Sequence, residues 1–155
     1  MKMQGEVGPF EVGLLDAQVD GTSTTAEENL AVARVKYALG EQTFVGLIST
    51  NGNPVSTGAN TVAGIDFYHR IPEFVGDMDL QISIDALGST GEAANDDGES
   101  FGVDLQARGQ VWSVQTGTRW VSNDFSPALG FVSRRGIRQS ELEVGFRPRA
   151  AEGSV

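Results

Sequence analysis

The sequence contains no cysteine and only one histidine. The absence of cysteine excludes disulfide cross-links, thiol catalysis and zinc sites that use sulfur ligands. No apolar run reaches the ~18 residues of a transmembrane helix, so a helical span is excluded within this sequence. Basic residues are also few, with 11 Lys and Arg against 21 Asp and Glu. The net charge of −10 repels phosphate backbones, and nucleic acid is therefore not an expected partner.

Proline is scarce, with 5 residues, whereas glycine is frequent, with 20. The 155 residues have the length of one domain, so we expect residues 1–155 to form a single β-barrel domain or an internal fragment of a larger barrel. Residues 1–7 lack the apolar segment and the cleavage site of a secretory signal. Because export to an outer membrane needs such a signal, either the chain is a mature segment or a fragment, or the membrane interpretation is wrong.

Helical spacing of apolar residues is nearly absent, and short strands separated by Gly, Asn, Asp and Pro dominate. The expected strands are 2–7, 10–19, 29–38, 43–50, 60–71, 79–88, 100–108, 110–121 and 138–147. Tight turns are expected at 8–9, 39–42, 72–78 and around Gly109, and longer loops at 20–28, 51–59, 89–99 and 122–137. Alternating short and long connections are typical of an up-and-down membrane barrel, whereas the Greek-key connections of a sandwich mix lengths.

Apolar and polar side chains alternate within these strands, so each strand has one apolar side and one charged side. In the strand 60–71, Ile65 and Phe67 share one side, and Asp66 and Tyr68 share the other. The side chains expected to face a water-filled lumen are Asp66, Tyr68, Arg70, Asp85, Asp104, Arg108 and Arg119. Two of the expected strands fit this alternation of apolar and polar side chains poorly. The apolar side switches within 10–19, which a β-bulge would explain, and 43–50 has apolar residues on both sides.

Trp112 and Trp120 lie on the apolar side, near the two ends of one expected strand. Their separation corresponds to about 26 Å along a strand, or roughly 20 Å of height at a tilt of about 40°. An outer-membrane barrel has an apolar band of similar height between two aromatic girdles. Both tryptophans are therefore candidates for the lipid interface, and the alternative is that they fill a core; the pair alone does not decide between the two.

Four segments carry a resemblance to a known family. Residues 7–15 and 29–50 are similar to two of its hairpins, and Gly64-Ile65-Asp66 is similar to its next strand. The most specific segment is 124–136, Asp-Phe-Ser-Pro-Ala-Leu-Gly-Phe-Val-Ser-Arg-Arg-Gly, which resembles its long loop. The family is the outer-membrane β-barrel domain of unknown function 5916, which usually follows a domain similar to family 9 carbohydrate-binding modules. The chain departs from it in lacking that preceding domain and the length of a full barrel.

The resemblance implies a location in the outer membrane of a Gram-negative cell. It also implies a porin-like role as scaffold, pore wall or surface receptor. The partners implied are the lipid bilayer and lipopolysaccharide, with carbohydrate as a further candidate.

Several residues are candidates for chemistry. His69 has no second histidine to complete a metal site, so a side chain at the barrel rim is the favoured interpretation. Residues 95–99, Asn-Asp-Asp-Gly-Glu, offer oxygen ligands for Ca²⁺ but lack the spacing of a calcium loop, which favours a solvated acidic loop. The basic segment 134–138 can contact lipopolysaccharide phosphates or an anionic sugar, or it can pair with loop carboxylates.

Glycoside hydrolysis needs two carboxylates that flank one bond. The candidates are Asp66, Asp85, Asp104, Glu141 and Glu143. They share their side with the cations Arg34, Lys36, Arg70, Arg108, Arg119 and Arg147. Mixed charges on a lumen wall normally form ion pairs and line water, and this interpretation is favoured.

The sequence therefore predicts an all-β, antiparallel up-and-down transmembrane barrel, or a fragment of one, with about eight or nine strands. It predicts no catalytic centre, no cofactor and no metal. Two alternatives stay open: a soluble antiparallel barrel or sandwich that binds a small ligand, and a fragment of a carbohydrate-active enzyme. In the membrane barrel the apolar side points outward to lipid, and in the soluble fold it points inward to a core.

Overall fold

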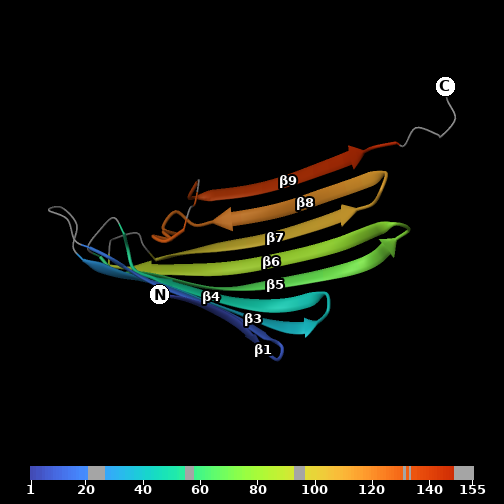
Figure 1. The fold of residues 1–155 in the computed structure, drawn as a ribbon. Coiled ribbons are helices and arrows are strands. Elements are labelled where there is room, and N and C mark those ends of the chain that lie inside the picture. Colours follow the sequence, from blue (N-terminus) through green and yellow to red (C-terminus); the bar gives the residue numbers. More distant parts are fainter. Residues whose placement is uncertain (21–26, 55–57, 93–96, 131, 133, 149–155) are drawn as a thin grey trace, which may run out of the picture.

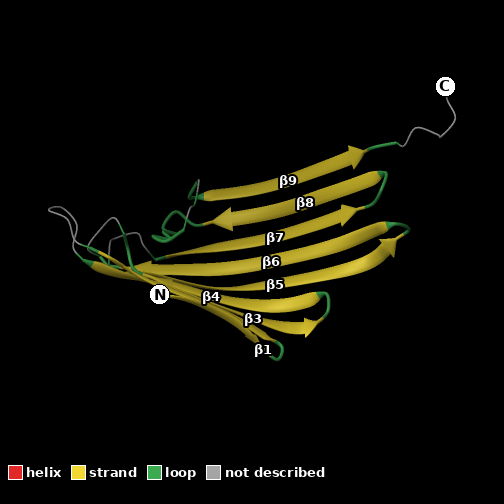
Figure 2. Ribbon diagram, in the orientation of Figure 1, coloured by secondary structure: helices red, strands yellow, loops and turns green. Residues whose placement is uncertain are grey.

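The fold is a single antiparallel sheet in which every strand pairs with its neighbour in sequence, as seen in a computed structural model (Figure 1). The structure describes residues 1–20, 27–54, 58–92, 97–130, 132 and 134–148. The strands are β1 (Lys2–Val7), β2 (Phe10–Val19), β3 (Glu28–Gly40), β4 (Thr43–Asn51), β5 (Asn60–Val75), β6 (Met78–Gly91), β7 (Gly98–Arg108), β8 (Trp112–Val121) and β9 (Ile137–Phe146). The described part of the chain contains strands and loops only (Figure 2).

The all-β, up-and-down prediction is confirmed. The nine strands follow one another across the sheet in the order β1 to β9, and every pair is antiparallel. Tight turns therefore lie at one end of all the strands, here called the turn end. The longer connections lie at the opposite end, here called the loop end (Figure 1).

The described residues include no helix long and apolar enough to cross a membrane.

The register assigns each strand residue to one of two faces, because directly paired residues point to the same side of a sheet. The polar face carries Asp66, Asp85 and Arg119, which lie in one continuous line of paired positions. The apolar face carries Ile65, Ala86 and Phe101, which are paired in the same way. The predicted lumen-facing residues all fall on the polar face, and Trp112 and Trp120 fall on the apolar face.

The sheet is staggered and open. A line of directly paired residues begins at Glu11, next to the β1–β2 turn, and ends at Gln139, near the loop end of β9. Such a stagger accompanies the strand tilt that curls a sheet into a barrel. The sheet does not close within the described residues, since β1 and β9 occupy its opposite edges. The arrangement matches an open barrel fragment rather than a closed eight-strand barrel.

Three details differ from the sequence-based expectations. The strand β2 contains no bulge, because its register with β1 and β3 runs without a shift. Leu15 and Ala17 instead lie on the polar face, opposite Val32 and Leu30. Residues 72–75, expected in a turn, extend β5 through a register shift between Ile71 and Val75, and the turn is confined to Gly76 and Asp77.

Substitution of Gly76 tests whether the turn between β5 and β6 requires a residue that adopts a positive φ. Gly76 has φ of 60°, and no atom lies within 4 Å of where a Cβ would be. Gly40, at the end of β3, has similar open space without a positive φ. We expect Gly76→Ala to lower the free energy of unfolding by about 1 kcal/mol through backbone strain alone, and Gly40→Ala to leave it unchanged or raise it slightly. Equal denaturant midpoints for the two variants would contradict this assignment.

Candidate functional site on the polar face

A row of directly paired residues crosses the polar face from β2 to β9 and is here called the charge row. Its members are Glu11, Lys36, Gly46, Asp66, Asp85, Gly102, Arg119 and Gln139. The two aspartates occupy neighbouring central strands, and a glycine stands on the far side of each. The row therefore places its two aspartates in the middle of the face, between Lys36 and Glu11 on one side and Arg119 on the other.

The guanidinium of Arg119 reaches across a glycine to a carboxylate two strands away. Arg119 Nη2 lies 2.8 Å from Asp85 Oδ1, and Nη1 lies 3.2 Å from Oδ2, which is a bidentate ion pair. Gly102 lies between them, and a Cβ there would stand 2.5 Å from Arg119 Nη2 and 2.6 Å from Asp85 Oδ1. Glycine is required at this position because the ion pair occupies the space of a side chain.

Asp66 repeats this arrangement from the other side. Arg34 on β3 donates to its two carboxylate oxygens at 2.8 and 2.9 Å, and a Cβ on the intervening Gly46 would stand 2.5 Å from Asp66 Oδ2. Lys36 pairs instead with its direct neighbour Glu11 at 3.1 Å. These pairs are only partly buried, so they contribute at most about 1 kcal/mol each, and their main effect is to fix side-chain positions.

The remaining predicted lumen residues extend this face toward the turn end. Tyr68 stacks on Phe44 with ring centroids 5.2 Å apart, and Arg70 pairs with Asp79. Asp104 lies over Gly117, where a Cβ would stand 2.5 Å from Asp104 Oδ1. Arg108 lines a shallow depression with Glu143 and Arg147. The candidates therefore share a face but do not converge on one point.

The carboxylates considered for glycoside hydrolysis are distributed along this face. Asp66 and Asp85 are direct neighbours in register, but each one is engaged by its own arginine. Glu141 and Glu143 lie on β9, opposite Gly117 and Gln115. The arrangement is that of an ion-pair network, as the mixture of charges on one side predicts.

The metal candidates are not brought together in the described residues. His69 Nδ1 lies 2.7 Å from Thr43 Oγ1, and its ring stacks on Phe67 at the turn end of the apolar face. Asn95 and Asp96 lie outside the described residues, and Asp97 accepts a hydrogen bond from the backbone N–H of Gly91 at 3.3 Å. No cluster of three or more metal-binding side chains occurs in the described part of the chain.

The β8–β9 connection folds onto the loop end of the polar face, which the sequence did not predict. Asn60, only 2% exposed, donates through Nδ2 to Ser126 O at 2.8 Å and accepts from Ala128 N–H at 3.0 Å. Ser89 Oγ accepts from Ser126 N–H at 3.0 Å. The Phe125 backbone lies against Gly98, where a Cβ would stand 2.1 Å from Phe125 N. Two polar side chains and one glycine thus fix the connection.

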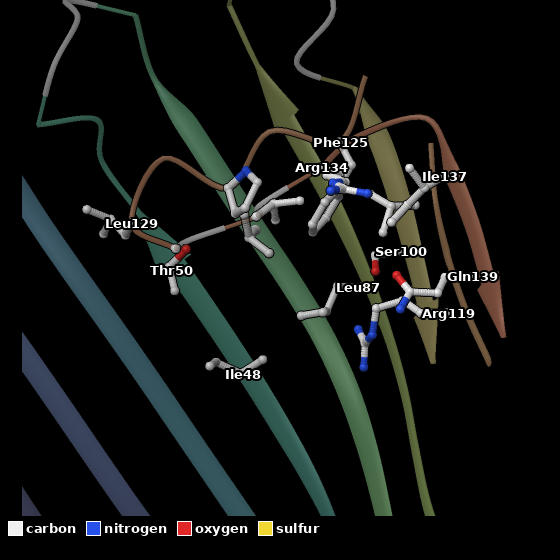
Figure 3. Close-up of a pocket in the computed structure, with 15 residues that line it drawn as sticks. Ile48, Thr50, Leu87, Ser100, Arg119, Phe125, Leu129, Arg134, Ile137 and Gln139 are labelled. Carbon is white, nitrogen blue, oxygen red and sulfur yellow. The ribbon is translucent and has the colours of Figure 1, made fainter. Parts of the chain in front are cut away.

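A pocket lies between this connection and the sheet, and is here called the loop pocket (Figure 3). Its volume is about 490 Å³, and its walls include Ile48, Val62, Leu87, Val121, Phe125 and Leu129. Val62, Val121 and Phe125 are the buried apolar side chains among the described residues. The small apolar core of this fold therefore lies at the loop end of the polar face. This explains why β4 carries apolar residues on both sides, because Ile48 lines the pocket, whereas Leu15 of β2 lies outside it and is 43% exposed.

Among the described residues, no second layer covers the apolar face. Leu47 is 55% exposed, Ile65 50% and Leu142 72%. The charged residues that the strands carry on this face lie toward its loop end: Asp16, Glu99 and Arg138. Thr116 and Thr118 donate their hydroxyls to the carbonyls of Glu141 and Gln139 at 3.0 and 3.2 Å, so these side chains are satisfied within the sheet.

Aromatic side chains mark both ends of the apolar face. At the turn end, Phe10 packs on Tyr37 with centroids 4.9 Å apart, and Trp112 packs on Phe146 at 4.5 Å. At the loop end, Trp120 is paired in register with Phe101. The two predicted tryptophans thus lie in aromatic groups at opposite ends of the face, each next to a phenylalanine on an adjacent strand.

The anchoring role of Asn60 gives a test of the loop geometry. We expect Asn60→Ala to release the β8–β9 connection, because it removes two hydrogen bonds and leaves backbone groups unpaired. The substitution should lower the free energy of unfolding by about 1–3 kcal/mol. Amide hydrogen exchange at Ser126 and Ala128 should accelerate at least tenfold. Asn51→Ala removes a hydrogen bond to Thr61 on the apolar face and is the matched control. Unchanged exchange in Asn60→Ala would contradict the anchoring role.

Gly102 provides a test of the charge row. We expect Gly102→Val to displace Arg119 and lower the free energy of unfolding by about 1–3 kcal/mol. Gly88→Val is the control, because a Cβ there has its nearest atom at 4.0 Å. Adding Arg119→Gln to Gly102→Val should lower the free energy of unfolding little further, because the ion pair is already lost in the single variant. Fully additive effects in this double-mutant cycle would contradict the proposed steric relation.

No family model, curated protein or solved structure that was compared with the chain matches it. The resemblance to the outer-membrane domain family 5916 therefore stays a prediction.

Proposed function

We propose that this chain forms part of the wall of an outer-membrane β-barrel, with its apolar face toward lipid and its polar face toward an aqueous interior. In this role it acts as a scaffold, pore wall or surface receptor and has no catalytic centre of its own. The supporting observation is the uncovered apolar face, on which large side chains such as Leu47 and Ile65 are half exposed. Exposed apolar patches of this extent mark interaction surfaces, and lipid is the partner that fits a continuous band.

Two features of the apolar face favour lipid over a second protein layer. Aromatic groups lie at its two ends, as in the girdles of membrane barrels. The hydroxyls of Thr116 and Thr118 are satisfied by backbone carbonyls, which is necessary where no water can bind them.

The polar face has the character of a lumen wall. Its four ion pairs involve partly exposed side chains, an arrangement suited to a water-lined surface. In a soluble sandwich or barrel, covering elements would pack on the apolar face. The β8–β9 connection instead packs on the opposite face, where Phe125 is buried. This placement argues against the soluble alternative.

A pair of arginine substitutions on adjacent residues of β7 tests the proposal. Leu105 lies on the apolar face and is 37% exposed, and Gln106 lies on the polar face. In lipid vesicles we expect Leu105→Arg to lower the free energy of unfolding by about 2–4 kcal/mol, because it places a charge in the bilayer. Gln106→Arg should change it by less than about 1 kcal/mol. Folded fractions can be measured by heat-modifiable gel migration across a urea series.

The outcomes are well separated. If the apolar face were in water, Leu105→Arg would change stability by only about 0.5 kcal/mol, as for most surface substitutions. Equal effects of the two variants in vesicles would contradict the proposal. Cooperative folding of the unmodified chain in buffer without lipid or detergent would also contradict it.

A further inference from the structure

The loop pocket has the size and lining of a ligand site. Its volume of about 490 Å³ falls within the roughly 300–1,000 Å³ of typical small-molecule pockets. One wall is the sheet, which contributes Ile48 and Leu87, and the other is the β8–β9 connection, which contributes Phe125 and Leu129 (Figure 3). Hydrogen bonds from Asn60 and Ser89 hold this second wall in place, so the pocket is preformed.

The charged groups of the pocket are all cationic. Arg119 and Arg134 line it, and no aspartate or glutamate does so among the described residues. Arg119 is engaged by Asp85. Arg134 has no carboxylate within ion-pair distance in the described part of the chain, although the chain carries a net charge of −10. In the close-up Arg134 lies on the same side of the pocket as Ile137, away from Ile48 (Figure 3).

We propose that the loop pocket binds an aliphatic carboxylate, a free medium-chain fatty acid. Its alkyl chain lies among Ile48, Leu87 and Leu129, and its carboxylate meets the guanidinium of Arg134. Apolar walls match the chain, and the uncompensated cation matches the head group. The pocket lies on the polar face, opposite the apolar face. On the proposed function, the ligand therefore enters from the aqueous interior as a free molecule rather than from the bilayer.

Other ligand classes fit the lining less well. Thr50, Ser100 and Gln139 give the lining some hydrogen-bonding groups. Its one aromatic ring among the described residues, Phe125, is only 3% exposed, so it offers no surface on which a sugar ring can stack. An alkyl ammonium ion would meet two arginines and no carboxylate. The arginines of the lining thus favour an anionic head group, and its apolar residues favour an alkyl tail.

The test uses octanoate, octanol and octylammonium as probes, with isothermal calorimetry on the full chain folded in amphipol. Arg134→Gln removes the cation. Ile48→Trp and Leu129→Trp fill the pocket from the sheet and the connection, respectively. Arg108→Gln is the matched control, because it removes a cation from the same face outside the pocket. Heat-modifiable migration confirms that each variant is folded before titration.

We expect octanoate to bind more tightly than octanol, and octylammonium not to bind. Arg134→Gln should weaken the affinity for octanoate by about tenfold, which corresponds to the loss of one charge-assisted hydrogen bond. It should leave the affinity for octanol unchanged. At least one of the tryptophan variants should fold and lose both ligands, and Arg108→Gln should behave as the unmodified chain.

Three results would overturn the assignment: equal binding of octanoate and octylammonium, no effect of Arg134→Gln on octanoate, or displacement of octanoate by an oligosaccharide. A folded chain that binds no octanoate would also overturn it. These failures are distinct from failure of the proposed function. If the chain folds in plain buffer, the membrane assignment is lost, but the same titrations there still decide whether the pocket takes a carboxylate.

Discussion

A sheet that forms a single layer cannot cover its own apolar face, and this constraint governs the rest of the structure. The strands β1 to β9 carry apolar side chains on one face, and the β8–β9 connection covers part of the other. Side chains such as Leu142 and Ile65 therefore depend on a partner outside the described chain. On the proposed function, a lipid bilayer meets this need without specific contacts, and its two interfaces match the aromatic groups at both ends of the face.

The polar face is divided into two zones. In the charge row, Gly46 makes room for the Asp66 carboxylate, and Gly102 makes room for the Arg119–Asp85 pair, so that arginines two strands away reach both aspartates. The second zone lies toward the loop end of the polar face, where apolar residues pack beneath Phe125. Arg119 lies at the boundary, because it belongs to the charge row and also lines the loop pocket. A wall of this kind combines a wet surface with a small apolar site in one layer.

Local patterns in the sequence predicted the fold well, because strand alternation and turn residues are local properties. All nine strands were located to within a few residues, and the faces of Asp66 and Trp112 were assigned correctly. The loop pocket was not predicted, since Asn60 meets Ser126 and Ala128 only through tertiary structure. Ile48 resembled a fault in the alternation for the same reason, because it lines the loop pocket. Leu15 lies on the polar face without a bulge, is 43% exposed, and has no structural explanation in the described residues.

The central claim is that the apolar face meets lipid and the polar face meets water. The chain has no cysteine, so single cysteines can be introduced one at a time for spin labelling along β6. In lipid vesicles, labels at Ile82 and Ile84 should be accessible to oxygen and protected from a polar nickel reagent. Labels at Ser83 and Asp85 should show the reverse pattern. Equal accessibility of all four positions to the polar reagent would contradict the account.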